Sequence, residues 1–288
     1  MNINSINRIS TYTSFILVLV MMVLNACTSV SSANIADLSE KDQTLLKDKS
    51  NNYKTLRVGQ FQVHYQKDSY SASQKETFKQ ELEYALSQSL KTVNVNSFDK
   101  EAHFILFPTK EEMDAHLGQL PIRHYVNPDY NTGYFVHNED LRPYFTQNLF
   151  QMIAIENWGR PKGIMLAIGG SLFADARCGD VKYFLDEVGA AYARTGNVMS
   201  YRAMFNDFYP SLQARPILAE IQAATLYQFV QDNFGTAKIR ELWTYGISRL
   251  EGVIYLSPGE VEREIIGRWK SYTPTQEVDL ENIDNFGC

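Results

Sequence analysis

The sequence has only three cysteines, Cys27, Cys178 and Cys288, and none of them belongs to a C-x2-C pair. This scarcity excludes a disulfide-dense scaffold and a cysteine-based zinc site. Basic residues are also in the minority, because 27 Lys and Arg stand against 33 Asp and Glu, a net charge of −6. A chain without a basic excess is not expected to bind nucleic acid.

An apolar run long enough to span a bilayer is missing as well. The longest apolar stretch, residues 14–24, is about half the length of the roughly 20 residues that a spanning helix needs. Arg8 precedes it. A short apolar stretch behind a basic residue is typical of the hydrophobic region of a signal peptide.

The residues that follow, Leu24-Asn25-Ala26-Cys27, resemble the bacterial lipobox. The resemblance implies that residues 1–26 are removed and that Cys27 becomes the lipidated first residue of the mature protein. An ordinary secretory signal that happens to contain a cysteine is the alternative. Acyl chains such as palmitate on Cys27 would anchor the protein to a membrane without spanning it. The expected location is the bacterial cell envelope. If the cell has two membranes, the outer membrane is favoured, because Thr28 stands where an aspartate often signals inner-membrane retention.

The remaining sequence divides into a tether and a folded part. Loss of Arg8 leaves 26 basic against 33 acidic side chains, which gives the mature chain a net charge of −7. Residues 27–52 are rich in Ser, Asn, Asp and Lys and are predicted to form a flexible tether. In an oxidising compartment Cys178 and Cys288 either form one disulfide or are two unrelated thiols.

The periodicity of the folded part predicts an α+β fold in which a small mixed sheet with helices precedes a mainly helical half. The expected boundaries are an α/β subdomain over 53–138, a helical subdomain over 139–272 and a C-terminal tail over 273–288. Strands are predicted over 55–65, 102–109 and 131–138, and early helices from Ser71 or Ser73 to Val93 and over 110–118. Later helices are predicted over 140–158, 161–176, 182–194, 216–234, 236–248 and 258–270.

Four phrases in this order of elements resemble the gluzincin metallopeptidases, specifically peptidase MA-like domains. They are residues 147–151, 166–172, 223–235 and 238–243. In that family a helix carries H-E-x-x-H, and a second helix supplies a glutamate as the third zinc ligand. Two histidines four residues apart lie on one helical face and bind the same ion, while the glutamate between them takes a proton from the zinc-bound water.

This sequence departs from the family pattern at every chemical position. Gln147 and Gln151 stand where the two histidines would be, Asn148 replaces the general base, and Gly169 replaces the third ligand. Amide oxygens bind zinc poorly, an amide is no general base, and glycine has no side chain. The sequence therefore predicts that zinc proteolysis is absent and that no cofactor is bound.

Other residues suggest no replacement chemistry. His64, His103, His116, His124 and His137 form no H-x3-H pair, and His137 is the one expected nearest a groove. The carboxylates Glu156, Asp175, Asp180 and Glu187 are expected on solvated helix faces. No G-x-S-x-G nucleophile motif occurs.

The amides at 147, 148 and 151 leave two interpretations open. They are either a polar stripe facing solvent or the floor of a cleft that hydrogen-bonds a peptide or a sugar. The leading hypothesis is a lipoprotein whose inactive metallopeptidase-like domain is a binding or scaffolding module for a peptide or an envelope protein. An extended peptide would add as a strand along Gly133-Tyr134-Phe135-Val136. The alternatives are a hydrolase with repurposed chemistry that does not use zinc and a purely structural envelope component.

Overall fold

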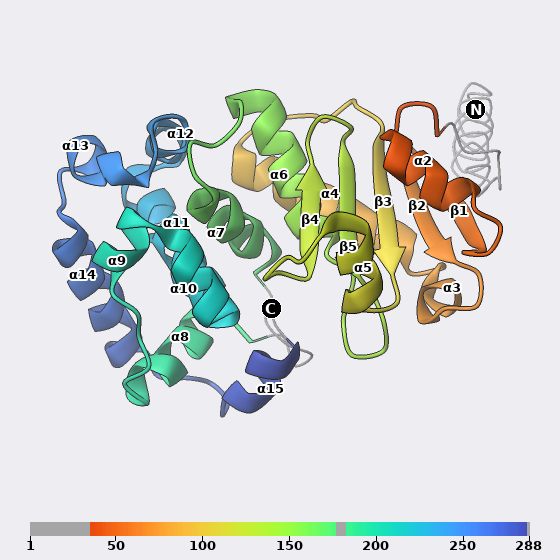
Figure 1. Cartoon of the computed structure of the whole chain (residues 1–288). Helices are drawn as coiled ribbons and strands as arrows, with labels where there is room; N and C mark the ends of the chain where they lie inside the picture. Colours follow the sequence, from red (N-terminus) through yellow and green to blue (C-terminus); the bar gives the residue numbers. More distant parts are fainter. Residues whose placement is uncertain (1–34, 177–182, 287–288) are drawn as a thin grey trace, which may run out of the picture.

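The computed structural model of the chain describes residues 35–176 and 183–286. Figure 1 shows a sheet half and a helical half side by side, so the predicted α+β class is confirmed. The proposed lipidation site Cys27 and both candidate disulfide partners, Cys178 and Cys288, lie outside the described residues.

A five-stranded mixed sheet forms the first half. Its strand order is β1-β2-β3-β5-β4, with β2, β3 and β5 parallel and the two edge strands β1 and β4 antiparallel to their neighbours. The strands are β1 (Tyr53–Val58), β2 (Phe61–Gln66), β3 (Ala102–Phe107), β4 (His124–Asn127) and β5 (Thr132–Val136).

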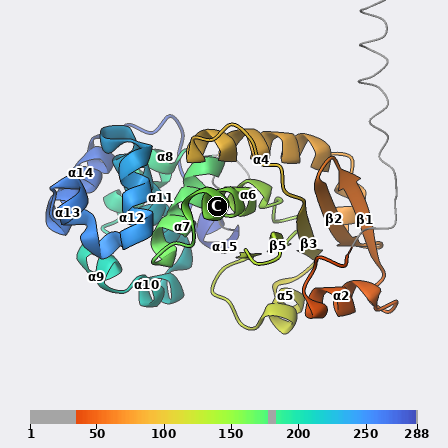
Figure 2. The ribbon, with the colours of Figure 1, turned by 90° about the horizontal axis from the view of Figure 1, so that it is seen from above.

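Helices cover both faces of this sheet (Figure 2), which explains why β3 and β5 are buried along their whole length. One face packs against α4 (Phe78–Val93) and α6 (Phe145–Trp158) through side chains such as Phe104 and Phe135. The other face, which carries Ile105 and Tyr134, packs with α5 (Lys110–Leu117) and α2 (Glu40–Lys47).

The sheet differs from the expected pattern at two places. The predicted single strand over 55–65 is a hairpin of β1 and β2, because Gly59 adopts a φ of 59° at the turn between them. The predicted helix up to Val93 is interrupted between α3 (Tyr70–Gln74) and α4. The four-residue strand β4 was not predicted, since so short a segment carries little periodicity.

The prediction that residues 27–52 form a flexible tether is wrong for α2. Asp42 on this helix is almost fully buried and accepts hydrogen bonds from Tyr134 Oη at 2.7 Å and from Ser39 Oγ at 2.5 Å. His116 Nε2 lies 2.7 Å from the other carboxylate oxygen. These bonds fix α2 to the sheet, and periodicity alone could not reveal them.

Eight helices, α7 to α14, and one 3-10 turn build the second half of the described chain. The helix α11 lies at its centre, and the first three turns of α11 are almost fully buried. The helix α11 begins at Pro216 and ends before Gly235, as the sequence predicted, because proline fits the first helical position and glycine the cap. The elements are α7 (Ile164–Asp175), α8 (Leu185–Arg194), α9 (Tyr201–Asn206), α10 (Phe208–Ala214), α11 (Pro216–Phe234), α12 (Thr236–Tyr245), η2 (Ile247–Arg249), α13 (Leu250–Ile254) and α14 (Pro258–Ser271).

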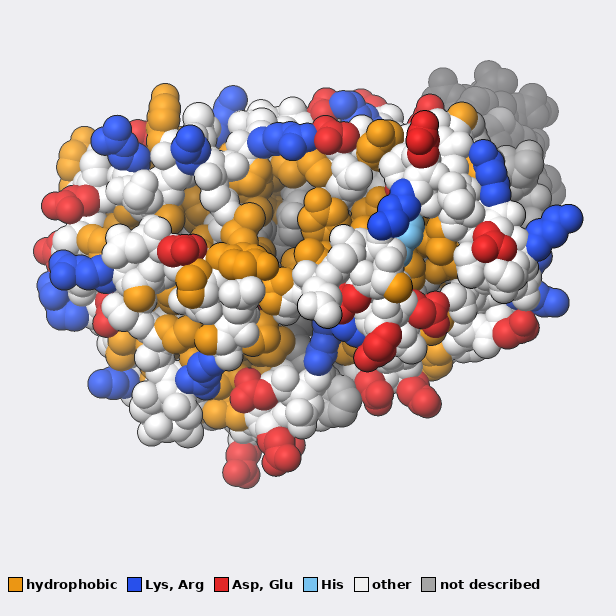
Figure 3. Space-filling view, viewed as in Figure 1, with side chains coloured by type: hydrophobic (Ala, Val, Ile, Leu, Met, Phe, Trp, Pro, Cys, Tyr) orange, Lys and Arg blue, Asp and Glu red, His pale blue; other side chains and the backbone are white. Residues whose placement is uncertain are grey.

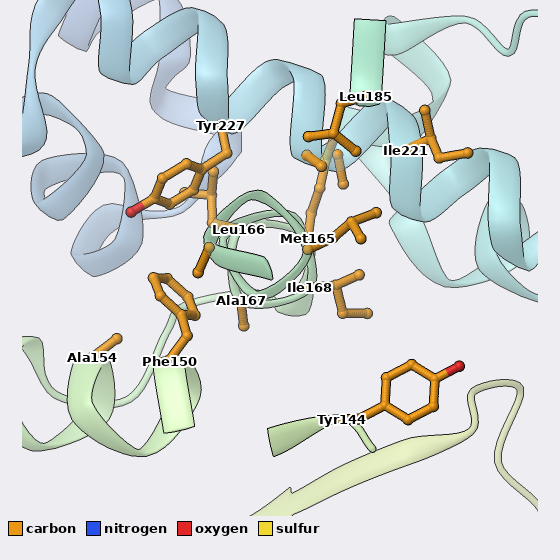
Figure 4. Close-up of a cluster of buried hydrophobic side chains, with 14 of the residues drawn as sticks. Tyr144, Phe150, Ala154, Met165, Leu166, Ala167, Ile168, Leu185, Ile221 and Tyr227 are labelled. Atoms are coloured by element: carbon orange, nitrogen blue, oxygen red, sulfur yellow. The ribbon is translucent and has the colours of Figure 1, made fainter. Parts of the chain in front are cut away.

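The helices α7 and α11 approach each other closely enough for backbone contact. A Cβ atom on Gly169 would lie 2.3 Å from the carbonyl oxygen of Ala223, so only glycine permits this contact. A Cβ on the next residue, Gly170, would meet the rings of Phe150 and Tyr227. Figure 4 shows the apolar cluster that surrounds α7, with Phe150 and Tyr227 on one side of the helix.

The C-terminal tail returns to both halves. Glu187 is fully buried and accepts hydrogen bonds from the backbone and the hydroxyl of Thr275. Beyond it, α15 (Leu280–Phe286) buries Ile283, and the guanidinium of Arg123 donates to the carbonyl of Asn285. The tail thereby connects the sheet half to the helical half.

A search of residues 35–176 and 183–286 finds no helix that is both long and apolar enough to cross a membrane.

We expect Gly169→Ala to lower the free energy of unfolding by about 1–3 kcal/mol, because the added methyl group must push α7 away from the α11 backbone. Gly267→Ala is the matched control, since a Cβ there meets nothing within 4 Å in the helix α14. This control should raise stability by about 0.5–1 kcal/mol. Urea denaturation of both variants measures the difference, and equal effects would contradict the close contact.

Candidate functional site

The amide side chains of Gln147 and Gln151 join α6 to α7. Gln151 Nε2 donates to Ser171 Oγ at 3.0 Å, and Gln147 Nε2 lies 3.5 Å from Asp175 Oδ2. Arg142 Nη1 binds the same carboxylate oxygen at 2.6 Å. These contacts set the register of the two helices.

Gly169 does not take part in this arrangement. Residues two apart on a helix point in directions about 200° apart, so Gly169 faces α11 while Ser171 faces α6. The structure therefore brings Gln147 and Gln151 together with Ser171 and Asp175, and not with Gly169.

The interpretation of the amides as a solvent-facing stripe is wrong for two of the three residues. Gln147 is 2% exposed and Asn148 is 0% exposed, while Gln151 is half-buried. Asn148 packs against the sheet, where a Cβ on Gly133 would lie 2.7 Å from its Nδ2 atom. Because Gly133 lacks a side chain, α6 can approach β5 at this point.

The carboxylates expected on solvated faces divide into two groups. Glu156 is exposed and pairs with Lys100, as expected. Asp175 and Glu187 are fully buried and bonded, so the expectation is wrong for both. Asp180 lies outside the described residues.

Four of the five histidines are engaged in pairwise contacts away from any shared site. His64 Nε2 and His103 Nδ1 are 3.1 Å apart, and His116 contacts the buried carboxylate on α2. His137, which was expected nearest a groove, shares a hydrogen bond with Ser71 Oγ at 2.9 Å. His124 is the one that lines a cavity between the two halves.

The predicted strand addition along Gly133-Tyr134-Phe135-Val136 is wrong, because β5 is paired on both sides, with β3 and with β4. The edge strand is β4. Val136 N donates to Arg123 O at 3.1 Å, so alternation turns the backbone groups of His124 and Val126 outward. These outward groups have no backbone partner within the described ranges.

A cavity of about 250 Å³, which we call the inter-half cavity, lies beside the start of β4. Figure 3 shows the molecular surface hollowed between the sheet half and the helical half. The cavity is lined by residues from α5 and the loop before β4, from β4, from the start of α6 and α11, and from α15: Lys110, Pro121, Ile122, Arg123, His124, Tyr144, Pro216, Ile217, Glu220 and Asp284.

Glu220 is the exceptional side chain of this cavity. It is 9% exposed and forms no hydrogen bond or ion pair with any residue of the described part of the chain. Burial raises the pKa of Glu220 to about 7, and the charge of Arg123 opposes this shift. Arg123 Nη1 is also buried without a hydrogen-bond partner among these residues.

A neutral histidine borders the same space. Burial lowers the pKa of His124 to about 4, and the neighbouring amide of Asn148 opposes the shift. The ring of His124 stacks on Tyr144 with centroids 5.3 Å apart. His124 Nδ1 is buried without a partner in the described part. The cavity wall therefore presents polar groups that the protein itself leaves unused.

No group of three or more His, Cys, Asp or Glu side chains suited to a metal ion occurs among the described residues. Sequence reasoning missed His124, Tyr144 and Glu220, because they come from elements far apart in the chain. One signal was available. Glu220 is the only charged residue between Pro216 and Tyr227, a stretch that is otherwise apolar or uncharged.

Comparisons of the chain with family models, with curated proteins and with solved structures found no match.

We expect Glu220→Gln to change how stability depends on pH. The pKa of Glu220 is higher in the folded protein than in the unfolded chain, so the folded state favours the protonated carboxyl. The free energy of unfolding of the wild-type protein therefore decreases as the pH rises from about 4.5 through 7. The variant has no such titration. Its free energy of unfolding relative to wild type should increase by about 2–3 kcal/mol between pH 5 and pH 8.

Urea denaturation at several pH values measures this difference. Glu264→Gln, at an exposed position of α14, removes the same charge and should run parallel to wild type. If Glu220→Gln also runs parallel, the raised pKa is refuted.

Proposed function

We propose that the chain is a lipid-anchored lipoprotein of the bacterial cell envelope. Its folded part would bind an extended peptide or a segment of another envelope protein without cleaving it. Zinc hydrolysis is not part of the proposal, because the four positions of the gluzincin resemblance hold amides and a glycine, and Gly169 faces away from Gln147 and Gln151.

The observation that carries the proposal is the unpaired outer edge of β4 next to the inter-half cavity. The backbone groups of His124 and Val126 point toward this edge and have no backbone partner among the described residues. The two residues are only 3% and 5% exposed, so an added strand would have to enter the hollow between the two halves to reach these groups. The cavity beside them would receive one side chain of that strand. Gln147 and Gln151 have a structural role in this proposal, because their side chains contact Asp175 and Ser171 of α7.

One observation favours a second function, hydrolysis without zinc. A buried carboxyl with a pKa of about 7 suits general acid or base catalysis, and the Glu220 carboxyl lines the same cavity as the Tyr144 hydroxyl. No Ser, Thr or Cys side chain lines the cavity, so it offers no hydroxyl or thiol nucleophile of the usual hydrolase type, and binding is the better supported function.

Binding is tested with the mature lipoprotein in detergent and peptides selected from a synthetic random library. Each selected peptide is resynthesised in two versions, one with N-methyl groups on the odd-numbered residues and one with N-methyl groups on the even-numbered residues. These two versions are the two methylation phases. We expect one phase to weaken binding about tenfold or more, since two backbone hydrogen bonds of about 0.5–1.5 kcal/mol each are lost. The other phase, with equal methylation, is the control.

Mass spectrometry of the bound peptide separates the two functions. Intact peptide is expected, whereas cleavage products that disappear in Glu220→Gln would establish the hydrolase. Equal loss of affinity in both methylation phases would rule out strand addition. Failure to select any peptide would favour a purely structural envelope component.

The anchor is tested by metabolic labelling with palmitate in a bacterial host. Wild-type protein should carry the label and sediment with membranes, because several acyl chains bind a bilayer stably. Cys27→Ser should lose both properties, while Cys178→Ser keeps them. Unlabelled wild-type protein cleaved and released in soluble form would show an ordinary secretory signal instead.

A further inference from the structure

The inter-half cavity contains two complementary groups that do not bind each other. Within residues 35–176 and 183–286, no hydrogen bond or ion pair is formed by Glu220, Arg123 Nη1 has no hydrogen-bond partner, and no ion pair joins the two side chains. Leaving such groups unused inside a protein is costly. The two groups therefore fit a ligand that donates a hydrogen bond to the Glu220 carboxyl and accepts one from Arg123 Nη1.

The other charged groups around the cavity already have partners. Lys110 pairs with Asp114 at 2.5 Å, and Asp284 accepts a hydrogen bond from Tyr192. Arg123 uses Nη2 to bind the backbone of α15. The charged groups of the cavity that are still available to a ligand are therefore Glu220 and Arg123 Nη1.

The size and walls of the cavity restrict the ligand further. Its volume of about 250 Å³ is below the roughly 300–1,000 Å³ typical of drug-sized ligands, which suits one amino-acid side chain. Ile122, Pro216 and Ile217 provide apolar contact for a methylene stem. On α11, Pro216 and Glu220 are four residues apart and share one face, so the stem would lead toward the carboxyl.

We propose that the inter-half cavity is a recognition pocket for a primary carboxamide, the side chain of a glutamine or asparagine in the bound peptide. Its NH2 group donates to the Glu220 carboxyl and its oxygen accepts from Arg123 Nη1. A lysine would face the charge of Arg123, and a glutamate would face Glu220. The assignment deepens the peptide-binding function and rests on it.

The ionisation of the carboxyl agrees with a neutral ligand. Because burial raises the pKa of Glu220 to about 7, the carboxyl is often protonated at neutral pH and then both donates and accepts. A primary carboxamide also both donates and accepts, so it pairs with either form.

The test uses a peptide that binds the mature lipoprotein and carries glutamine at the residue next to the cavity. Its affinity is compared with those of versions carrying norleucine, glutamate or lysine at that residue. We expect the glutamine peptide to bind at least about tenfold more tightly than each of the three. Equal binding of all four would overturn the pocket assignment while the peptide-binding function stands.

Glu220→Leu assigns the preference to the pocket. This variant should reduce the ratio between glutamine and norleucine peptides to about one, without changing the affinity for norleucine more than about twofold. A merely structural role would weaken both peptides together. Glu220→Gln retains an acceptor and should keep part of the preference, and Glu264→Gln should keep all of it.

A direct probe keeps the two proposals separable. The protein is labelled with ¹³C at glutamate Cδ, and the Glu220 resonance is assigned by its loss in Glu220→Gln. Butyramide should shift this resonance. Butanol and butylammonium should leave it unchanged. A butyramide shift without any peptide binding would preserve the pocket and reject the peptide function. Absence of both, or a stronger response to butylammonium, would overturn the pocket.

Discussion

The architecture depends on the contact between Gly169 of α7 and the backbone of Ala223 in α11. At this point the two helices are too close for any side chain, so their relative rotation is restricted by backbone contact. That rotation turns Ser171 and Asp175, on the opposite face of α7, toward α6. Since α6 packs on the sheet, one glycine helps to set how the helical half meets the sheet half.

The polar residues between α6 and α7 complete this connection. A buried ion pair between Arg142 and Asp175, with Gln147 beside it, needs all its partners in place because an isolated buried charge is strongly unfavourable. Gln147 and Gln151 thus have a structural role that requires no metal ion. Amides are well suited to it, since one side chain both donates and accepts.

The inter-half cavity contrasts with this satisfied network. Glu220, Arg123 Nη1 and His124 Nδ1 remain without partners in the described residues, and the cavity they border adjoins the unpaired edge of β4. Polar groups without partners at a cavity can form hydrogen bonds with a ligand, whereas the groups between α6 and α7 are already bonded. The binding proposals follow from this contrast.

Local sequence signals determined the fold class and most of the elements in the protein. Alternating or helical periodicity and the Pro216 and Gly235 boundaries specify α11 and β3 without reference to other residues. Long-range contacts decided the rest: α2 is held through Asp42, β4 is recognisable through its pairing with β5, and His124, Tyr144 and Glu220 meet only when two halves pack. The reason is physical, because periodicity records which face of an element is buried, whereas the partner that buries it depends on the packing of the entire chain.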